Sequence, residues 1–233
     1  MDPRRALSFG AAAQTYAAAR PSYPVDAVRF VLPAAAQRVL DLGAGTGKLT
    51  SVLLDLGLEV VAVEPDDAMR ALIDPRADVR SGTAEDLPVA DASVDAVVVG
   101  QAWHWFDEPT ATAQVRRVLR PEGTLGLLWN VLDDRVDWCH ALADAIGMED
   151  RLSLVNQTDE RPGAVLDGWR RQLFAHRQPA DADLVVANIA SRSIVLVLPA
   201  AERADHLERV RQLLPTGGFD LPWVTDAWVT TVA

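Results

Sequence analysis

The chain has 233 residues, 49% of them hydrophobic, enough for one α/β domain with a sizeable core. Its net charge of −11 disfavours nucleic acid as a partner. The single cysteine, Cys139, excludes an internal disulfide, and we expect it to be a small buried residue in a reducing compartment. No long apolar stretch follows Arg4 and Arg5, and the longest apolar runs are too short to span a bilayer. We therefore expect a cytoplasmic protein that does not bind membranes.

The spacing of apolar residues predicts alternating helices and strands. In chain order we expect helices at 14–19 and 24–32, a strand at 39–42, a helix at 49–56, a strand at 59–64, a helix from 66 or 67 to 73, strands at 77–81 and 94–100, a helix ending before Pro121, and a strand at 124–129. Beyond residue 130 the pattern is weaker and indicates a helix around 142–146, a strand at 170–177, a helix at 182–190, a helix around 207–214 and a strand at 224–232. This alternation predicts a doubly wound parallel sheet with helices on both faces.

Three alternate glycines, Gly43, Gly45 and Gly47, follow the first predicted strand. Such glycines allow a sharp turn and let a ligand approach main-chain N–H groups. The NAD fingerprint GxGxxG fits neither register of these glycines, and a Walker A loop needs Ser or Thr after Gly47-Lys48, where leucine stands. What is left is D-x-G-x-G-x-G starting at Asp41, which predicts a nucleoside-type cofactor site other than the NAD or P-loop kinds.

Residues 41–47 resemble motif I of the class I methyltransferases that use S-adenosylmethionine. Further matches follow in the same order. VVAVEPDDAMR (60–70) resembles the second cofactor motif, SGTAEDLPVADASVDAVVVGQAWHWFD (81–107) the adenine-side loop with the fourth strand, and RVLRPEGTLGLLW (117–129) the helix, turn and fifth strand. The opening FGAAAQTYAAARPSYP (9–24) resembles the N-terminal cap of a small-molecule subgroup that includes trans-aconitate methyltransferases.

The resemblance implies a Rossmann-like sheet of seven strands, mostly parallel with the last strand antiparallel, and an N-terminal helical cap. It also implies a single methyltransferase domain over 1–233. Within it we expect a cap or lid at 1–35, a cofactor-binding core at 36–130, and a C-terminal part at 131–233 that completes the sheet with helical insertions.

Each part of the donor S-adenosylmethionine needs its own partner. The glycine turn, with Ala44 inside it, offers backbone groups to the amino-acid portion. Asp41 is placed either to bind the donor's ammonium or to hold the loop, and Glu64, nineteen positions after Gly45, to accept hydrogen bonds from the ribose hydroxyls. The alternative for Glu64 is an exposed acid at a strand end.

For the adenine, the resemblance implies an apolar slot made partly by Pro65 and Met69, although Met69 also fits a core position. The residues Thr83, Ala84 and Glu85 are expected along its edge. An acid is common in the family where Thr83 stands, so Glu85 or a backbone group is the alternative contact. Gln101, just after the fourth predicted strand, is expected to contact the cofactor.

The acceptor side is expected at the segment QAWHWFD, because ligands of open α/β sheets bind at the carboxyl ends of strands. Trp103 and Trp105 would wall the reacting methyl group, with at least one aromatic residue of the segment structural. His104 is the candidate catalytic residue. It is a candidate base, a donor to an acceptor carboxylate, or a packing residue.

In the predicted lid, Tyr16 and Tyr23 are expected to face the substrate, and Arg20 to pair with the donor's carboxylate or with an acidic acceptor. Alternatively Arg20 is a surface residue.

We therefore expect an S-adenosylmethionine-dependent methyltransferase that acts on a small molecule through a carboxylate, hydroxyl or similar nucleophile by in-line displacement. One alternative changes the acceptor to a quinone, polyketide or lipid-like intermediate. Another is a cofactor-binding protein without transfer activity. No His, Cys and acid spacing typical of a metal site occurs, so we expect no metal. The sequence leaves the oligomeric state open.

Overall fold

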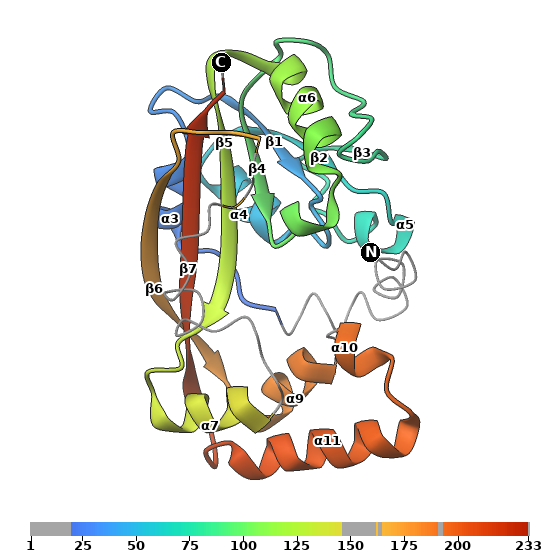
Figure 1. The fold of residues 1–233 in the computed structure, drawn as a ribbon, viewed down its shortest axis with the longest axis vertical. Helices are drawn as coiled ribbons and strands as arrows, with labels where there is room; N and C mark the ends of the chain where they lie inside the picture. Colours follow the sequence, from blue (N-terminus) through green and yellow to red (C-terminus); the bar gives the residue numbers. More distant parts are fainter. Residues whose placement is uncertain (1–19, 146–161, 163–164, 191–192, 233) are drawn as a thin grey trace.

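A seven-stranded sheet forms the centre of the computed structural model, which describes residues 20–145, 162, 165–190 and 193–232 (Figure 1). Its strands are β1 (Arg38–Leu42), β2 (Glu59–Val63), β3 (Asp78–Arg80), β4 (Val94–Gly100), β5 (Leu119–Leu132), β6 (Arg170–Ala180) and β7 (Phe219–Thr231). The helices are α3 (Val25–Val31), α4 (Lys48–Asp55), α5 (Asp67–Arg70), the 3-10 turn η2 (Trp103–Trp105), α6 (Glu108–Val118), α7 (Asp137–Ala145), α9 (Ala182–Ala190), α10 (Ser193–Leu196) and α11 (Ala200–Leu213).

The strand order is β3-β2-β1-β4-β5-β7-β6. Strands β1 to β5 pair in parallel, whereas β7 lies between β5 and β6 and is antiparallel to both. The expected mostly parallel sheet with an antiparallel last strand is therefore confirmed. The chain order reverses between β1 and β4, and such a switch point opens a crevice at the carboxyl ends of the strands.

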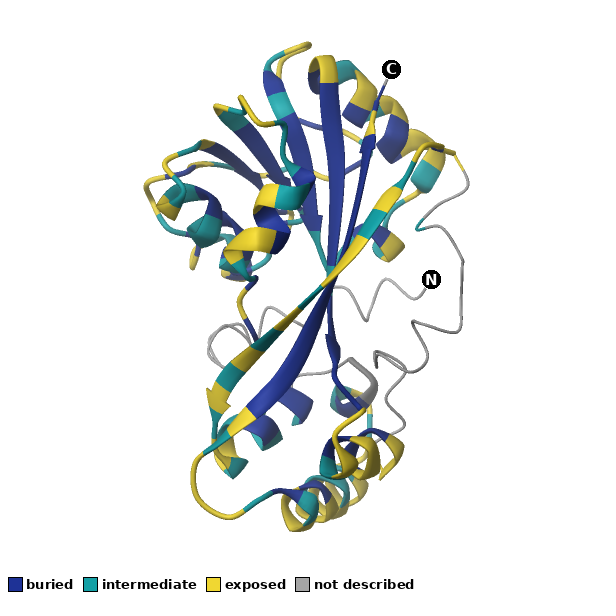
Figure 2. Cartoon of the chain, turned by 90° about the vertical axis from the view of Figure 1, so that its left-hand side faces the viewer, coloured by how far each residue is buried: buried dark blue, intermediate teal, exposed yellow. Residues whose placement is uncertain are grey.

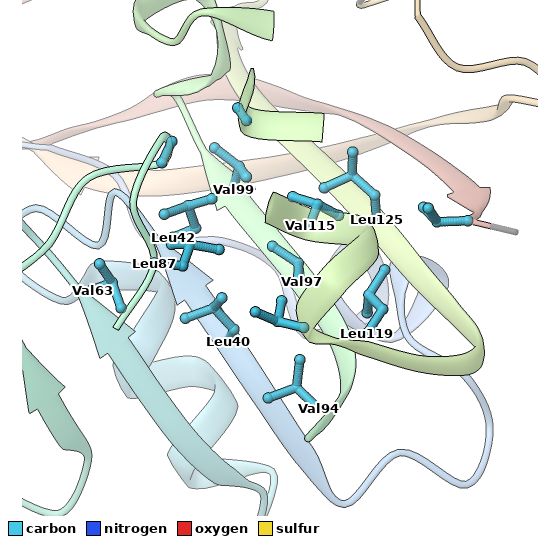
Figure 3. Packing of buried hydrophobic residues seen from close by; sticks show 14 of the residues in the cluster. Leu40, Leu42, Val63, Leu87, Val94, Val97, Val99, Val115, Leu119 and Leu125 are labelled. Carbon is cyan, nitrogen blue, oxygen red and sulfur yellow. The ribbon is translucent and has the colours of Figure 1, made fainter. Parts of the chain in front are cut away.

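Alternate residues of the central strands build a core on each face of the sheet, as strand geometry requires. On one face Leu40 and Leu42 of β1 pack with Val97 of β4 and Val115 of α6 (Figure 3). On the other face Val39 lies in a cluster with residues of α3 and α4. Each such fully buried side chain contributes about 1.5–3 kcal/mol relative to an exposed one. These two cores fix the positions of the strand ends that surround the crevice.

A third core lies at the far end of the long strands β5 and β7, under α7, α9, α10 and α11 (Figures 1 and 2). It contains Cys139, which is fully buried, and burial raises the pKa of this thiol to about 12. The expectation that Cys139 is a buried packing residue is confirmed. The segment after β5 thus adds a helical lobe with its own apolar centre.

Most predicted elements occur within two residues of their expected ends, but α5 is shorter than expected, and β5, β6, β7, α7 and α11 extend further than expected. Helix α5 ends at Arg70 and not at 73, because the amides of Leu72 and Ile73 bond three residues back and tighten the chain into a turn. Strand β5 begins at Leu119, before Pro121, because its pairing with β4 shifts register there. The expected helix at 14–19 lies outside the described residues.

The expected cap at 1–35 is described from residue 20 onward, and its two parts differ. In α3, Val28 and Val31 are fully buried, and the helix packs on the sheet as part of the second core. Of the described residues of the cap, Arg20, Pro21 and Tyr23, which precede α3, reach the crevice. The lid function of 1–19 stays a prediction.

Candidate cofactor and active site

A cavity occupies the switch point at the carboxyl ends of β1, β2 and β4. It is lined mostly by apolar atoms and by two acids and two cations. The lining residues are Arg20, Pro21, Tyr23, Asp41, Gly43, Ala44, Gly45, Thr46, Lys48, Leu49, Glu64, Pro65, Met69, Gly100, Gln101, Ala102, Trp105, Phe106 and Asn130.

The glycine loop, whose backbone conformation suits glycine, lines the cavity through Gly43 and Gly45. Gly43, Gly45 and Gly47 have φ values of +68°, +57° and +83°, in the left-handed region that other residues rarely adopt. A Cβ on Gly43 would lie 3.0 Å from the Cβ of Ala102 and 3.1 Å from the Cζ of Phe106. The loop after β1 therefore packs directly against the segment after β4. Gly47 is the N-cap of α4 and does not line the cavity.

Glu64 holds the glycine loop and the start of α5 together. Its Oε2 accepts a hydrogen bond from the amide of Gly45 at 2.8 Å, and its Oε1 accepts one from the amide of Asp66 at 2.9 Å. Glu64 is 6% exposed, and burial raises the pKa of its carboxyl against the lowering effect of these bonds. A carboxylate has about four lone-pair sites. Glu64 therefore keeps acceptor capacity for hydroxyl groups of a ligand.

Asp41 presents a buried oxygen that accepts no hydrogen bond within the part of the chain that the structure describes. Its Oδ2 accepts one from the hydroxyl of Thr50, whereas its Oδ1 has no partner. Burial raises the pKa of Asp41 to about 7, the bonds from Thr50 lower it, and the nearby charge of Glu64 adds to the rise. An unmatched buried carboxylate oxygen costs free energy unless a ligand donates to it. The site thus fits a ligand that carries a cation or a donor at this point.

The segment after β4 divides its aromatic residues between core and cavity. Trp103 is 4% exposed and packs edge-on against Phe106 in the first core, with ring centroids 5.8 Å apart. Trp105 and Phe106 line the cavity. His104 is exposed and its ring lies 4.9 Å from that of Trp105, but it is not part of the lining. One of the aromatic residues is thus structural, as expected, and His104 is not among the residues that line the cavity.

Several residues predicted to contact the cofactor or substrate are not among the cavity lining. On the adenine side, Thr83 pairs with Asp86 in an isolated bridge, Ala84 is buried in the first core, and Glu85 accepts a hydrogen bond from the amide of Asp107 at 3.0 Å. Through its bond to Asp107, Glu85 ties this loop to the segment after β4. Three more predicted site residues are not among the lining, namely Gly47, Trp103 and His104. Tyr16 lies outside the described residues.

Asn130, in β5, is a lining residue that sequence reasoning missed. Its Nδ2 donates to the carbonyl of Ser22 at 3.2 Å, and its Oδ1 accepts from the hydroxyl of Thr225 at 2.6 Å. Its own carbonyl accepts from the Nε2 of Gln101 at 2.9 Å. Asn130 therefore joins the entry to α3, the segment after β4 and strand β7. The available signal was a polar residue directly after the mostly apolar run 125–129.

Other missed lining residues surround the glycine loop: Pro21, Thr46, Lys48, Leu49, Gly100 and Ala102. Among the described residues no group of three or more His, Cys, Asp or Glu side chains is placed to hold a metal ion. Within the same part of the chain, no helix is long and apolar enough to cross a membrane.

Comparison with known proteins identifies the family of this site. A model described as a methyltransferase domain matches residues 40–127. An uncharacterized methyltransferase of Mycobacterium tuberculosis is 44% identical over 238 residues, covering 97% of this chain and 96% of that protein. The solved structure of a provisionally named type II methyltransferase from Anaeromyxobacter dehalogenans matches with a TM-score of 0.61 and 25% identity, over 91% of this chain and 98% of that chain.

A more distant relative, an uncharacterized methyltransferase-like protein of Schizosaccharomyces pombe, is 38% identical over 141 residues, covering 57% of this chain and 55% of that protein. The chain belongs to the class I S-adenosylmethionine-dependent methyltransferases. It is a methyltransferase enzyme, and the expected family is confirmed.

Proposed function

We propose that the cavity binds S-adenosylmethionine and that the enzyme transfers its methyl group to a small molecule. The observation that carries this proposal is the unpartnered Oδ1 of buried Asp41 beside the glycine loop. It matches the ammonium of the donor's amino-acid end. Glu64 is placed to accept hydrogen bonds from the two ribose hydroxyls, and Pro65 and Met69 offer an apolar slot for the adenine. When bound, the donor supplies an electrophilic methyl group on a sulfonium.

The chain's own residues contribute positioning and exclusion of water. Trp105 and Phe106 form an apolar wall where the segment after β4 meets the glycine loop. Such a wall excludes water, and an aromatic face attracts a cation such as a sulfonium. Methyl transfer by in-line displacement depends mainly on alignment of the two reactants. An acceptor that is already an anion needs no base, which agrees with the absence of His104 from the lining.

We propose an acceptor that reacts through a carboxylate, a hydroxyl or a similar nucleophile. Arg20 supports this choice because it places a cation on the cavity lining. The alternative acceptor is a quinone, polyketide or lipid-like molecule, and the mostly apolar lining favours it. The two classes differ in charge, so a panel of acceptors separates them.

The test is release of S-adenosylhomocysteine with aliphatic dicarboxylic acids, aromatic carboxylic acids, phenols and a short-chain quinol as acceptors. Turnover with the acids, and a KM that rises when Arg20 is replaced by methionine, supports an acidic acceptor. Turnover with the quinol alone would support the alternative, a quinone, polyketide or lipid-like acceptor. Binding of S-adenosylmethionine without turnover of any member would support a binding protein without transfer activity.

A further inference from the structure

Lys48 is the only lysine of the sequence, and it lies on the cavity wall. It is the first residue of α4, directly after the glycine loop, between Thr46 and Leu49 of the lining. Apart from its histidines, all the other basic residues of the chain are arginines. The cavity thus holds a compact ammonium, that of Lys48. In the sequence, Lys48 served only to exclude a Walker A loop.

The position of Lys48 is unfavourable in the protein alone. The first turn of a helix carries partial positive charge, so a cation there is repelled and an anion is attracted. The first turn of α4 contains no acid, and its N-cap, Gly47, has no side chain to bond the free amides. Burial lowers the pKa of Lys48, and no neighbouring carboxylate offsets that effect. Among the described residues, no hydrogen bond or ion pair holds this ammonium.

A second, independent observation concerns the carboxylate of Asp41 in the same cavity. The Oδ1 of Asp41, 1% exposed, also has no partner, so one unmatched carboxylate oxygen and one unmatched ammonium line the same cavity. The two do not form an ion pair with each other. A ligand end that carries both an ammonium and a carboxylate satisfies both groups. Arg20, the other cation of the lining, already makes an interaction within the chain.

We propose that Lys48 binds the carboxylate of the methyl donor's amino-acid end, while Asp41 binds its ammonium. This inference rests on the proposed function, because it assigns a contact to the donor. It transfers to Lys48 a contact that the sequence placed on Arg20. The zwitterion would lie across the start of α4, where the helix end also favours the carboxylate.

The test compares two ligands that differ only at the amino-acid end. S-adenosylhomocysteine carries the zwitterion, whereas 5′-methylthioadenosine has the same adenine, ribose and sulfur without it. Titration calorimetry of Lys48→Met should show S-adenosylhomocysteine binding weakened about 10- to 100-fold, since a charged hydrogen bond is worth roughly 1.5–3 kcal/mol. Binding of 5′-methylthioadenosine should change less than about twofold. Lys48→Arg keeps the charge and should recover most of the loss.

Arg76→Met is the matched control for net charge, because it removes an exposed cation outside the cavity. It should leave both affinities unchanged. Equal loss of both ligands in Lys48→Met would show a structural role and overturn the inference, as would unchanged binding of S-adenosylhomocysteine. Failure of the wild-type protein to bind S-adenosylhomocysteine would instead overturn the proposed function together with the inference.

A single lysine permits a second readout that needs no substitution. An amine-selective reagent modifies only Lys48 and the α-amino group, and peptide mass spectrometry separates the two. S-adenosylhomocysteine should slow modification of Lys48 at least about tenfold, whereas 5′-methylthioadenosine at equal saturation should protect much less. Equal protection by both ligands would contradict contact with the carboxylate.

Discussion

Glu64 and Gly45, nineteen positions apart in the sequence, are joined by a 2.8 Å hydrogen bond from the Gly45 amide to Oε2 of Glu64. The acid at the end of β2 therefore orders the loop after β1 before any ligand arrives. Order of this kind lowers the entropic cost of binding. Glu64 thus supports the cavity and, in the proposed function, also accepts hydrogen bonds from the donor's ribose.

Replacement of Glu64 by alanine should weaken binding of S-adenosylhomocysteine about 100-fold, because it removes the ribose contact and the support of Gly45 at once. Titration calorimetry measures this loss. Glu59→Ala, an exposed acid at the opposite end of β2, is the control and should bind normally. Unchanged affinity of Glu64→Ala would remove Glu64 from the donor site.

Asp41 should make folding less favourable as pH rises. The pKa of its carboxyl is about 7 in the folded protein against 3.8 ordinarily, so between these values the folded state holds a proton that the unfolded chain releases. Stability from this group is therefore lost as pH increases through that window, and Glu64, whose pKa is also raised, acts in the same direction. Urea unfolding of wild type and Asp41→Asn checks this.

The free energy of unfolding of wild type minus that of Asp41→Asn should fall by about 1–4 kcal/mol between pH 5 and pH 8. A difference independent of pH would show that Asp41 is ionised throughout. The donor's ammonium selects the ionised carboxylate, so binding of S-adenosylhomocysteine should strengthen over the same interval in wild type and not in the variant.

Gly43→Ala should destabilise the protein by about 1–3 kcal/mol, because it combines a positive φ with a Cβ crowded by Ala102 and Phe106. Thermal unfolding gives the value. Gly57→Ala is the matched control, with φ of +80° and no atom within 4 Å of the added Cβ, so it isolates the cost of the backbone. Equal losses in the two variants would mean that the contact with the segment after β4 does not contribute to stability.

Asn130→Ala should lower the free energy of unfolding by about 2–3 kcal/mol, since it leaves the Ser22 carbonyl and the Thr225 hydroxyl without their partner. Thr225→Val removes one of these bonds and should cost less. We also expect Asn130→Ala to weaken donor binding, because Ser22 positions the lining residues Pro21 and Tyr23. Stability equal to wild type would show that other contacts hold this entry segment.

His104→Ala should change kcat less than about tenfold and leave its pH profile in place, since the exposed imidazole braces Trp105 without lining the cavity. Acceptor KM should rise a few-fold through the loss of that support. Steady-state kinetics from pH 5 to pH 9 provides both values. Disappearance of the limb of the profile near pH 6.5, the ordinary pKa of histidine, would restore His104 as the base.

The donor half of the cavity was largely predictable, whereas its adenine edge and acceptor side were not. Glycines at positive φ and an acid at a strand end are local requirements, so Gly43 and Glu64 stand out in the sequence. Glu85 and Trp103 share a motif with lining residues, but the direction of each side chain depends on turns set by long-range packing. Asn130 acts through partners far away in the sequence, such as Thr225, which no local pattern reveals.

The fold was predictable for a similar reason. Runs such as 94–100 are buried on both faces, and their nearly continuous apolar sequence is typical of parallel strands. The insertion of β7 between β5 and β6 is a property of topology, and only the resemblance to a family implied that the last strand is antiparallel. The helices over the third core were harder to predict from the spacing of apolar residues. Helix α11, for example, buries only Val210, so it has almost no apolar face to recognise in the sequence.

Titration of S-adenosylhomocysteine into the wild-type protein, with NAD titrated in parallel, tests the central claim most directly. The account predicts one site per chain with a micromolar or tighter Kd for S-adenosylhomocysteine, and no binding of NAD at the same concentrations. Binding of NAD without binding of S-adenosylhomocysteine would contradict the assignment of the Asp41 and Glu64 cavity to the methyl donor.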